Sequence, residues 1–217
     1  MTDNNSSLVR IIDGARVRLT GALDGTIRME LFSVAKEFFQ RSNIWREEIP
    51  FIVVPGVDSY ELNGEHRGLV NRLLWVEGAR QPPGSGLVHP GPMKFAVLPR
   101  TGGLTAVVKI RDNPSQNELW YAHVALTVAD PTDRLGLPFM PDWIVEKYSS
   151  TLTDGVVARL AAYPNKPFSN RALAAYHGRE FRNGTNLAKN EAAHGNVFGG
   201  QAWSFPQGFR SRNQKVW

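Results

Sequence analysis

The sequence predicts an α+β fold: an antiparallel β-sandwich or sheet in the middle of the chain, packed with a helical bundle from N- and C-terminal helices, plus an extended C-terminal arm. Three observations support this prediction. Apolar residues recur at helical spacing near the N-terminus, short β-branched and aromatic runs bounded by turn residues follow, and helical spacing returns after about residue 138. Because strands and helices are segregated along the chain, a parallel α/β fold is disfavoured.

The first helix is expected from about residue 24 to 42. One apolar stripe recurs there at helical spacing: Ile27, Leu31, Ala35 and Phe38. Asp24 or Thr26 can accept hydrogen bonds from the free amides at the helix start. We expect this helix to supply a stripe of the core and no chemistry.

The β-rich region extends from residue 49 to 128. Six short segments have the composition of strands, namely 49–54, 60–62, 69–77, 93–98, 104–111 and 119–128. The first two flank a Pro-Gly turn at residues 55–59, which is typical of a hairpin. In the last segment Trp120, Ala122 and Val124 alternate with their neighbours, which predicts a strand of an antiparallel sheet or sandwich.

Two further helices are expected at about 141–162 and 170–192. The first carries apolar residues four positions apart: Ile144, Tyr148, Leu152, Val156 and Leu160. Pro164 limits its C-terminus, since the residue before a proline avoids the helical conformation. Ser169 or Asn170 can cap the second helix.

Composition places the chain among ordinary globular proteins. It has 217 residues, 42% hydrophobic and 21% charged, with no apolar run near the roughly 20 residues that span a bilayer. We expect one α+β domain at 1–193 and a separate arm at 194–217. The absence of cysteine excludes disulfides and thiolate metal sites, and the first residues lack the features of a signal peptide, which favours synthesis in the cytoplasm.

The net charge of +5 is concentrated at one end of the chain. Residues 165–217 hold eight basic and two acidic side chains, a net charge of +6, so the remainder carries −1. Diffuse phosphate binding by the body of the fold is therefore not indicated. The basicity belongs to the last helix and the arm.

No catalytic constellation is recognisable in the sequence. The five histidines, His66, His89, His123, His177 and His194, occur singly and are interpreted as surface or structural residues. Glu47 and Glu48 are adjacent in an extended segment and point to opposite faces. Ser33 and the other serines lack a nucleophile elbow. We expect no enzyme activity, no metal and no cofactor.

The arm combines large aromatic side chains with residues that prevent regular structure. The aromatic residues are Phe198, Trp203, Phe205, Phe209 and Trp217, and four glycines and a proline interrupt them. Disordered termini are normally poor in aromatic residues, so the arm is expected to seek burial on a partner. A disordered end or stacking on single-stranded bases are the alternatives.

The order of several short motifs resembles a known family. They read ELFSVAKEFF at 30–39, NIWREEIP at 43–50, VPGVDSYEL at 54–62, LPFMPDWI at 137–144, ARL at 158–160, KPFSN at 166–170 and AAYH at 174–177, followed by Phe181. Together they are similar to the head-to-tail adaptor (connector) proteins of tailed bacteriophages, of the tail tubular protein A type of podoviruses. The resemblance covers residues 17–181 and is weakest at 63–136.

The resemblance implies a structural virion protein at the head–tail junction. Members form a ring, dodecameric in the family, that lies between the portal protein and the tail nozzle or other tail proteins and continues the DNA channel. Genomic DNA would pass through without sequence-specific binding, and no membrane would be involved. The arm would dock on the portal through Phe198, Trp203, Phe205, Phe209, Arg210, Arg212, Lys215 and Trp217.

Three other functions stay open on the sequence. A tail-completion or terminator ring would dock on the tail tube instead of the portal. A single-strand nucleic-acid-binding module would use the aromatic and basic residues of the arm. A small polymer hydrolase would need carboxylates such as Glu47 and Asp58, for which no acid–base partner is recognisable.

Overall fold

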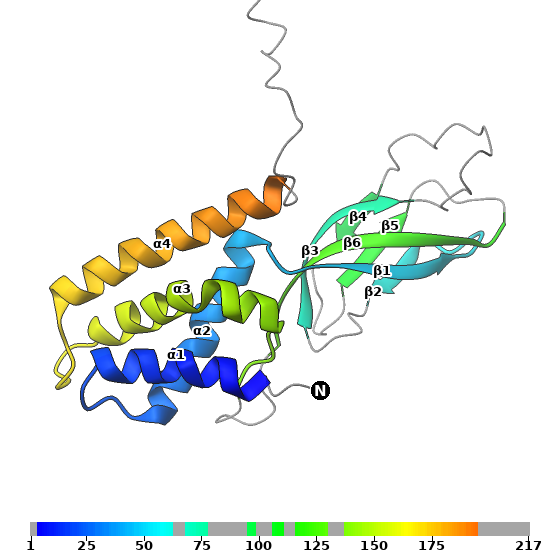
Figure 1. Ribbon diagram of the computed structural model, residues 1–217. Coiled ribbons are helices and arrows are strands. Elements are labelled where there is room, and N and C mark those ends of the chain that lie inside the picture. Colours follow the sequence, from blue (N-terminus) through cyan, green and yellow to red (C-terminus); the bar gives the residue numbers. More distant parts are fainter. Residues whose placement is uncertain are drawn as a thin grey trace, which may run out of the picture.

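The computed structural model describes residues 4–62, 68–77, 95–98, 106–110, 116–129 and 137–194, and these residues form a helical bundle and a β-region lying end to end (Figure 1). Helices from both ends of the described chain form the bundle, and all strands lie between them in sequence. The predicted α+β class is therefore confirmed.

In the described part of the chain the bundle consists of four helices: α1 Asn4–Arg18, α2 Asp24–Ser42, α3 Asp142–Ala161 and α4 Arg171–His194. The last three match the predicted helices to within two residues at each end. The sequence pattern did not predict α1, which begins with polar residues of low helix propensity. Its signal was a short apolar stripe that the structure buries: Leu8, Ile11, Ile12, Ala15 and Leu19.

The central helix of the bundle is α3, which contacts the other three helices. It is buried around most of its circumference, so its sequence is apolar on more than one face. Gly155 permits this close packing, because a Cβ atom there would lie 2.5 Å from Val34 of α2 and 2.8 Å from Phe181 of α4. The bundle is thus held together mainly by apolar contacts with α3.

Within the described residues, six strands form two antiparallel three-stranded sheets. One has the order β1-β6-β3, made of Arg46–Val53, Glu118–Val128 and Gly68–Glu77. The other has the order β2-β5-β4, made of Ser59–Leu62, Ala106–Ile110 and Phe95–Leu98. The inner faces of both sheets belong to one hydrophobic cluster, with Phe51 of β1 against Tyr60 of β2 at 5.5 Å between ring centres. The arrangement is a small sandwich.

The predicted hairpin of residues 49–62 is wrong. β1 pairs with β6 and β2 pairs with β5, so the turn between β1 and β2 carries the chain from one sheet to the other. The hydroxyl of Tyr60 stabilises this turn, donating to the carbonyl oxygens of Val54 or Val57 and accepting from the amide of Val54. Local turn chemistry was identified correctly, but the choice of partner strand depends on burial of Val53 and Leu62 between the sheets.

β6 joins the sandwich to the bundle. Its predicted alternation holds from Trp120 to Val124, but residues 125–128 are buried on both faces because this end of the strand contacts α2. Trp45 lies at the same joint, with its ring 5.4 Å from Phe39 and close to Gly68, where a Cβ atom would lie 2.7 Å from the indole. A single hydrophobic cluster therefore runs through both parts.

Of the two predicted helix caps, the structure confirms that of α4 and contradicts that of α2. The amide of Leu173 donates to Oδ1 of Asn170 at 3.0 Å, so the predicted cap of α4 is confirmed. The predicted cap of α2 is wrong, because Leu23 occupies that position without a side-chain hydrogen bond. The carboxylate of Asp24 instead accepts two hydrogen bonds from Arg16 of α1, at 3.1 and 2.6 Å. The side chain of Asp24 therefore joins α1 to α2 and does not cap α2.

Among the helices within the described ranges, none has both the length and the apolar composition required to cross a bilayer.

Candidate functional site

The predicted docking residues all lie outside the described residues. They are Phe198, Trp203, Phe205, Phe209, Arg210, Arg212, Lys215 and Trp217. The structure does describe the place where the arm begins, at the C-terminal end of α4, whose last residue is His194. Figure 1 shows this end of α4 at the edge of the bundle.

Two residues of α3 hold the end of α4 through one carboxylate, and we call this group the clasp. Nζ of Lys147 contacts Oε1 of Glu191, and the hydroxyl of Tyr148 donates to Oε2 of the same residue at 2.5 Å. Glu191 lies one helical turn before the arm, and its side chain is only 17% exposed. Both carboxylate oxygens are therefore occupied.

The clasp shifts the pKa values of Glu191 and Tyr148 in opposite directions. The hydrogen bond from Lys147, and then that from Tyr148, lowers the pKa of Glu191 below its usual value. Burial, and then the hydrogen bond to Glu191, raises the pKa of Tyr148. The charged carboxylate and the neutral phenol are thus the forms that the folded protein favours.

Tyr148 anchors the clasp in the core. Its ring centre lies 5.3 Å from that of Phe38 in α2, and its backbone leaves helical geometry at φ −112° and ψ 18°, where α3 is kinked. The tyrosine therefore contacts α2 with its ring and α4 with its hydroxyl. The root of the arm is fixed to the bundle by both apolar and charged contacts.

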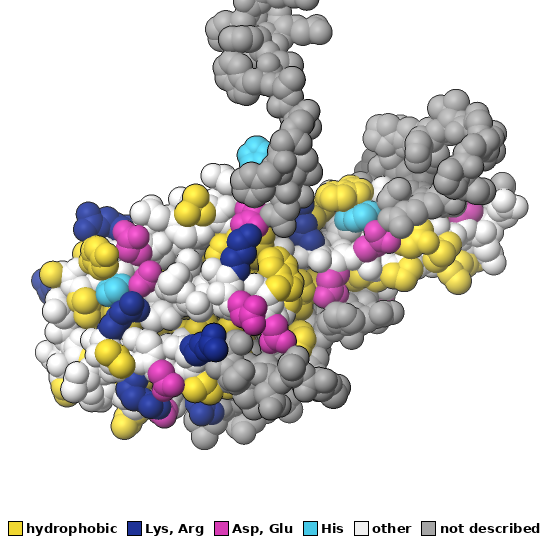
Figure 2. Space-filling view, viewed as in Figure 1, with side chains coloured by type: hydrophobic (Ala, Val, Ile, Leu, Met, Phe, Trp, Pro, Cys, Tyr) yellow, Lys and Arg dark blue, Asp and Glu magenta, His cyan; other side chains and the backbone are white. Residues whose placement is uncertain are grey.

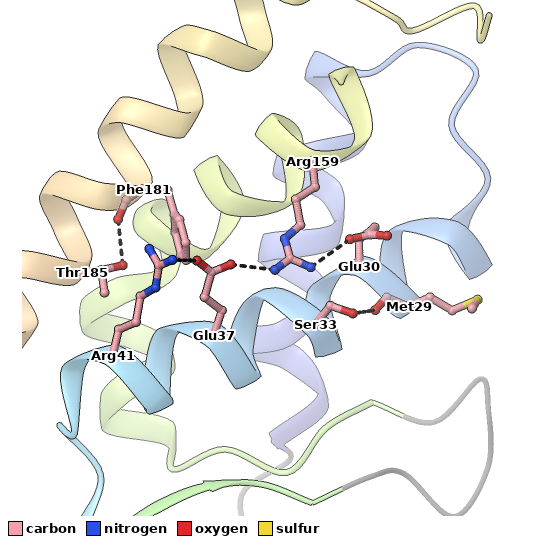
Figure 3. Close-up of polar contacts among 8 residues, drawn as sticks. All are labelled: Met29, Glu30, Ser33, Glu37, Arg41, Arg159, Phe181 and Thr185. Carbon is pink, nitrogen blue, oxygen red and sulfur yellow. Dashed lines mark hydrogen bonds and ion pairs between the residues drawn. The ribbon is translucent and has the colours of Figure 1, made fainter. Parts of the chain in front are cut away.

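A second polar group joins α2 to α3 nearer the other end of the bundle (Figure 3). Arg159 lies between two carboxylates, with Nη2 2.6 Å from Glu37 and Nη1 3.5 Å from Glu30. Glu37 also pairs with Arg41 at 2.9 Å, and Glu30 accepts a hydrogen bond from the hydroxyl of Tyr163. Each carboxylate has a cationic partner, so this group fits a structural role and not acid–base catalysis.

Ser33 and His177 are engaged in structural contacts. Ser33 donates to the carbonyl oxygen of Met29 in its own helix at 3.3 Å (Figure 3). His177, buried on α4, has its Nδ1 2.8 Å from Asp154, which also faces Arg18. The structural role predicted for this histidine is confirmed.

The paired glutamates of β1 diverge as predicted. Glu47 accepts a hydrogen bond from the indole of Trp45 at 3.0 Å, whereas Glu48 faces Nε2 of His123 at 3.9 Å. His66 and His89 lie outside the described residues, and His194 is exposed at the end of α4. Across the described ranges, no group of three or more histidine or acidic side chains could hold a metal ion.

The outer face of the β1-β6-β3 sheet carries exposed apolar side chains. Ile52 and Leu119 are cross-strand partners and are 59% and 45% exposed. Further along the sheet the ring of Trp75, 46% exposed, stacks on His123 at 4.3 Å. We call these four residues the sheet patch; Figure 2 shows hydrophobic side chains gathered over this part of the molecule. Adjacent exposed apolar groups are typical of contact surfaces.

Comparison with known proteins does not assign the chain to a family. No protein-family model matches the chain, and no curated protein gives a match. The resemblance to head-to-tail adaptors therefore depends on the order of the motifs in the sequence.

Proposed function

We propose that this protein is a structural component of a bacteriophage virion, a ring-forming adaptor between portal and tail that continues the DNA channel and provides the platform for tail attachment. The observation that carries the proposal is the clasp, a fixed root for an aromatic and basic arm. A fixed root would hold the start of a docking segment in a defined place, as docking on another protein requires.

The positions of the quoted motifs support the same proposal. NIWREEIP begins β1 and supplies Trp45 at the joint of bundle and sandwich, and VPGVDSYEL forms the turn between the sheets with Tyr60. LPFMPDWI leads into α3, and KPFSN forms the turn that ends in the Asn170 cap of α4. The motifs therefore specify the junctions of the fold, where a shared architecture requires particular residues.

The arm would act as a docking segment that orders on the portal. Aromatic anchors such as Trp203 and Phe205 give most of the binding energy when they enter pockets of a partner. The glycines let the segment follow a foreign groove, and the ordering entropy is lost only upon assembly. Arg210, Arg212 and Lys215 would add charged contacts at the edge of the interface. The sandwich, with its sheet patch, would then face the tail.

The test is light scattering of the purified protein, alone and mixed with the portal ring. We expect a large complex with the native chain and little or none with a Trp203→Ala/Phe205→Ala variant. Glu191→Gln, which leaves every arm residue in place but weakens the clasp, should reduce binding by a smaller factor. A matched control is Glu180→Gln, an exposed residue of α4 away from the clasp.

Undiminished portal binding by the double arm variant would overturn the docking role of the arm. A complex that forms only with the tail tube would instead assign the protein to the tail-completion rings. Chemical cross-linking from position 203 identifies the contacted protein in either case.

A further inference from the structure

The exposed side of α4 carries four cations that have no partner among the residues that the structure describes. They are Arg171, Arg179, Arg182 and Lys189, and we call them the basic stripe. Several cations of the other helices are neutralised: Arg16 pairs with Asp24, and Arg41 and Arg159 pair with Glu37. The stripe differs from these pairs because one helix presents four exposed cations and no described carboxylate forms an ion pair with any of them.

Helical geometry places the basic stripe along one side of α4. At about 100° per residue, Arg171, Arg182 and Lys189 fall within about 20° of one line, and Arg179 lies about 80° from it. The acidic residues Glu180 and Glu191 lie at least about 100° from every member. The four cations extend over roughly 27 Å at 1.5 Å per residue.

The face that α4 buries points elsewhere. Its buried residues are His177, Phe181, Thr185, Ala188 and Ala192, which pack toward α3 and α2. In Figure 1 α4 forms one edge of the bundle, so its other side is accessible. Burial of the apolar face excludes the use of α4 as a membrane-surface helix, which would need that face for lipid.

The residues between the cations are small or carry amides. Ala175 and Asn186 lie on the same side of the helix, whereas the exposed apolar residues Tyr176 and Leu187 lie about 140–160° from its central line. Protein interfaces usually depend on large buried anchors, and the basic stripe has none. Small neighbours and amide donors allow the phosphate backbone of a nucleic acid to approach closely.

We propose that the basic stripe binds the phosphate backbone of duplex DNA without reading sequence. B-DNA presents about one negative charge per 1.7 Å of axis, so a surface of about 27 Å meets more phosphates than it has cations. The stripe is straight and contains no acidic side chain to repel them. This inference goes beyond the proposed function, because the stripe and the arm use different residues.

The test measures binding of the full-length protein to a 20-base-pair duplex of arbitrary sequence. Fluorescence anisotropy reports the binding constant at several salt concentrations. Four phosphate contacts predict a slope of about −3.6 for log K against log salt, equivalent to roughly 150-fold weaker binding from 50 to 200 mM. The Arg171→Gln/Arg179→Gln/Arg182→Gln/Lys189→Gln variant should lose this contribution, about 0.9 of slope per charge removed. Two duplexes of different sequence should bind equally.

A matched control removes the cations of the arm, in Arg210→Gln/Arg212→Gln/Lys215→Gln. We expect the stripe variant to lose most of the slope and the arm variant to keep most of it. The reverse result would overturn the inference and assign duplex binding to the arm. Because the stripe residues are exposed and unpaired among the described residues, thermal unfolding should be unchanged, which separates lost binding from lost folding.

Polyglutamate serves as the competing polyanion. If the stripe variant loses polyglutamate binding while its affinity for duplex DNA is unchanged, the stripe recognises an acidic protein and the inference is wrong. Portal binding by the stripe variant, measured by light scattering, should be unchanged, so failure of this inference is distinguishable from failure of the adaptor proposal.

Discussion

Two glycines of α4 should respond in opposite ways to the same substitution. Gly178→Ala places a Cβ atom 3.8 Å from that of Ala158, which is ordinary contact. Gly184→Ala places it 2.3 Å from Oγ1 and 2.6 Å from Cγ2 of Thr151 in α3. Since Thr151 is β-branched and nearly buried, it cannot turn away freely. Only the second substitution should force α3 and α4 apart.

The magnitude follows from two terms. Replacing a helical glycine with alanine stabilises a helix by about 1 kcal/mol, and this gain is common to both variants. Overpacking a well-packed site lowers the free energy of unfolding by about 1–3 kcal/mol, and this loss applies to Gly184→Ala alone. The two variants should therefore differ by about 1–3 kcal/mol in free energy of unfolding. In a chain of this size that corresponds to roughly 2–12 °C in melting temperature.

The assay is urea denaturation followed by circular dichroism, with both variants compared with the native chain. Thr151→Ala provides the rescue, because it removes the two atoms that the new Cβ would meet first. In the Thr151→Ala background, Gly184→Ala should destabilise the fold much less than it does in the native chain. The double-mutant cycle should therefore give a coupling energy of about 1–3 kcal/mol. Equal stability of Gly178→Ala and Gly184→Ala would refute the close packing of α3 on α4.

Four further outcomes are expected. Arg159→Gln should destabilise the fold by about 1 kcal/mol, because it leaves Glu30 and Glu37 without their shared cation, and added salt should reduce the difference in unfolding free energy. The lowered pKa of Glu191 means that its stabilisation is present above its unfolded pKa and is lost as pH falls through the folded value, so acid titration of unfolding should be shallower in Glu191→Gln. The raised pKa of Tyr148 has the opposite sign, so its stabilisation should decline above about pH 10 and Tyr148→Phe should remove that decline. Asn170→Ala should destabilise the fold by about 1 kcal/mol, because it removes the cap of α4. Ser169→Ala removes a different contact of the same turn and is the control. A greater loss of helix content in Ser169→Ala than in Asn170→Ala, measured by circular dichroism, would refute the assignment of the cap.

Sequence patterns were most informative where one periodicity decides the structure. The apolar stripe of residues 27–38 predicted α2, and the four-residue spacing from Ile144 to Leu160 predicted α3. The strand segments were identified from β-branched and aromatic composition. These features depend on residues that are neighbours in the chain, so local sequence patterns predict them.

Contacts between residues far apart in the chain could not be predicted from local sequence patterns. The clasp joins Tyr148 to Glu191, and the sheet patch brings Ile52 beside Leu119, although nothing in either local pattern identifies the partner. The apparent hairpin failed for the same reason. Turn residues specify that the chain reverses, whereas the pairing of strands depends on which faces are buried together.

By itself, the sequence determined the fold class, the places of α2, α3, α4 and six strands, the divergence of Glu47 from Glu48, and the concentration of positive charge in residues 165–217. Only the tertiary structure decided that β1 pairs with β6, that Glu191 is held by α3, and that the four cations of the basic stripe are exposed without an ion pair to a described carboxylate. Periodicity and charge are properties of neighbouring residues, whereas pairing and exposure are settled by the packing of elements far apart in the chain.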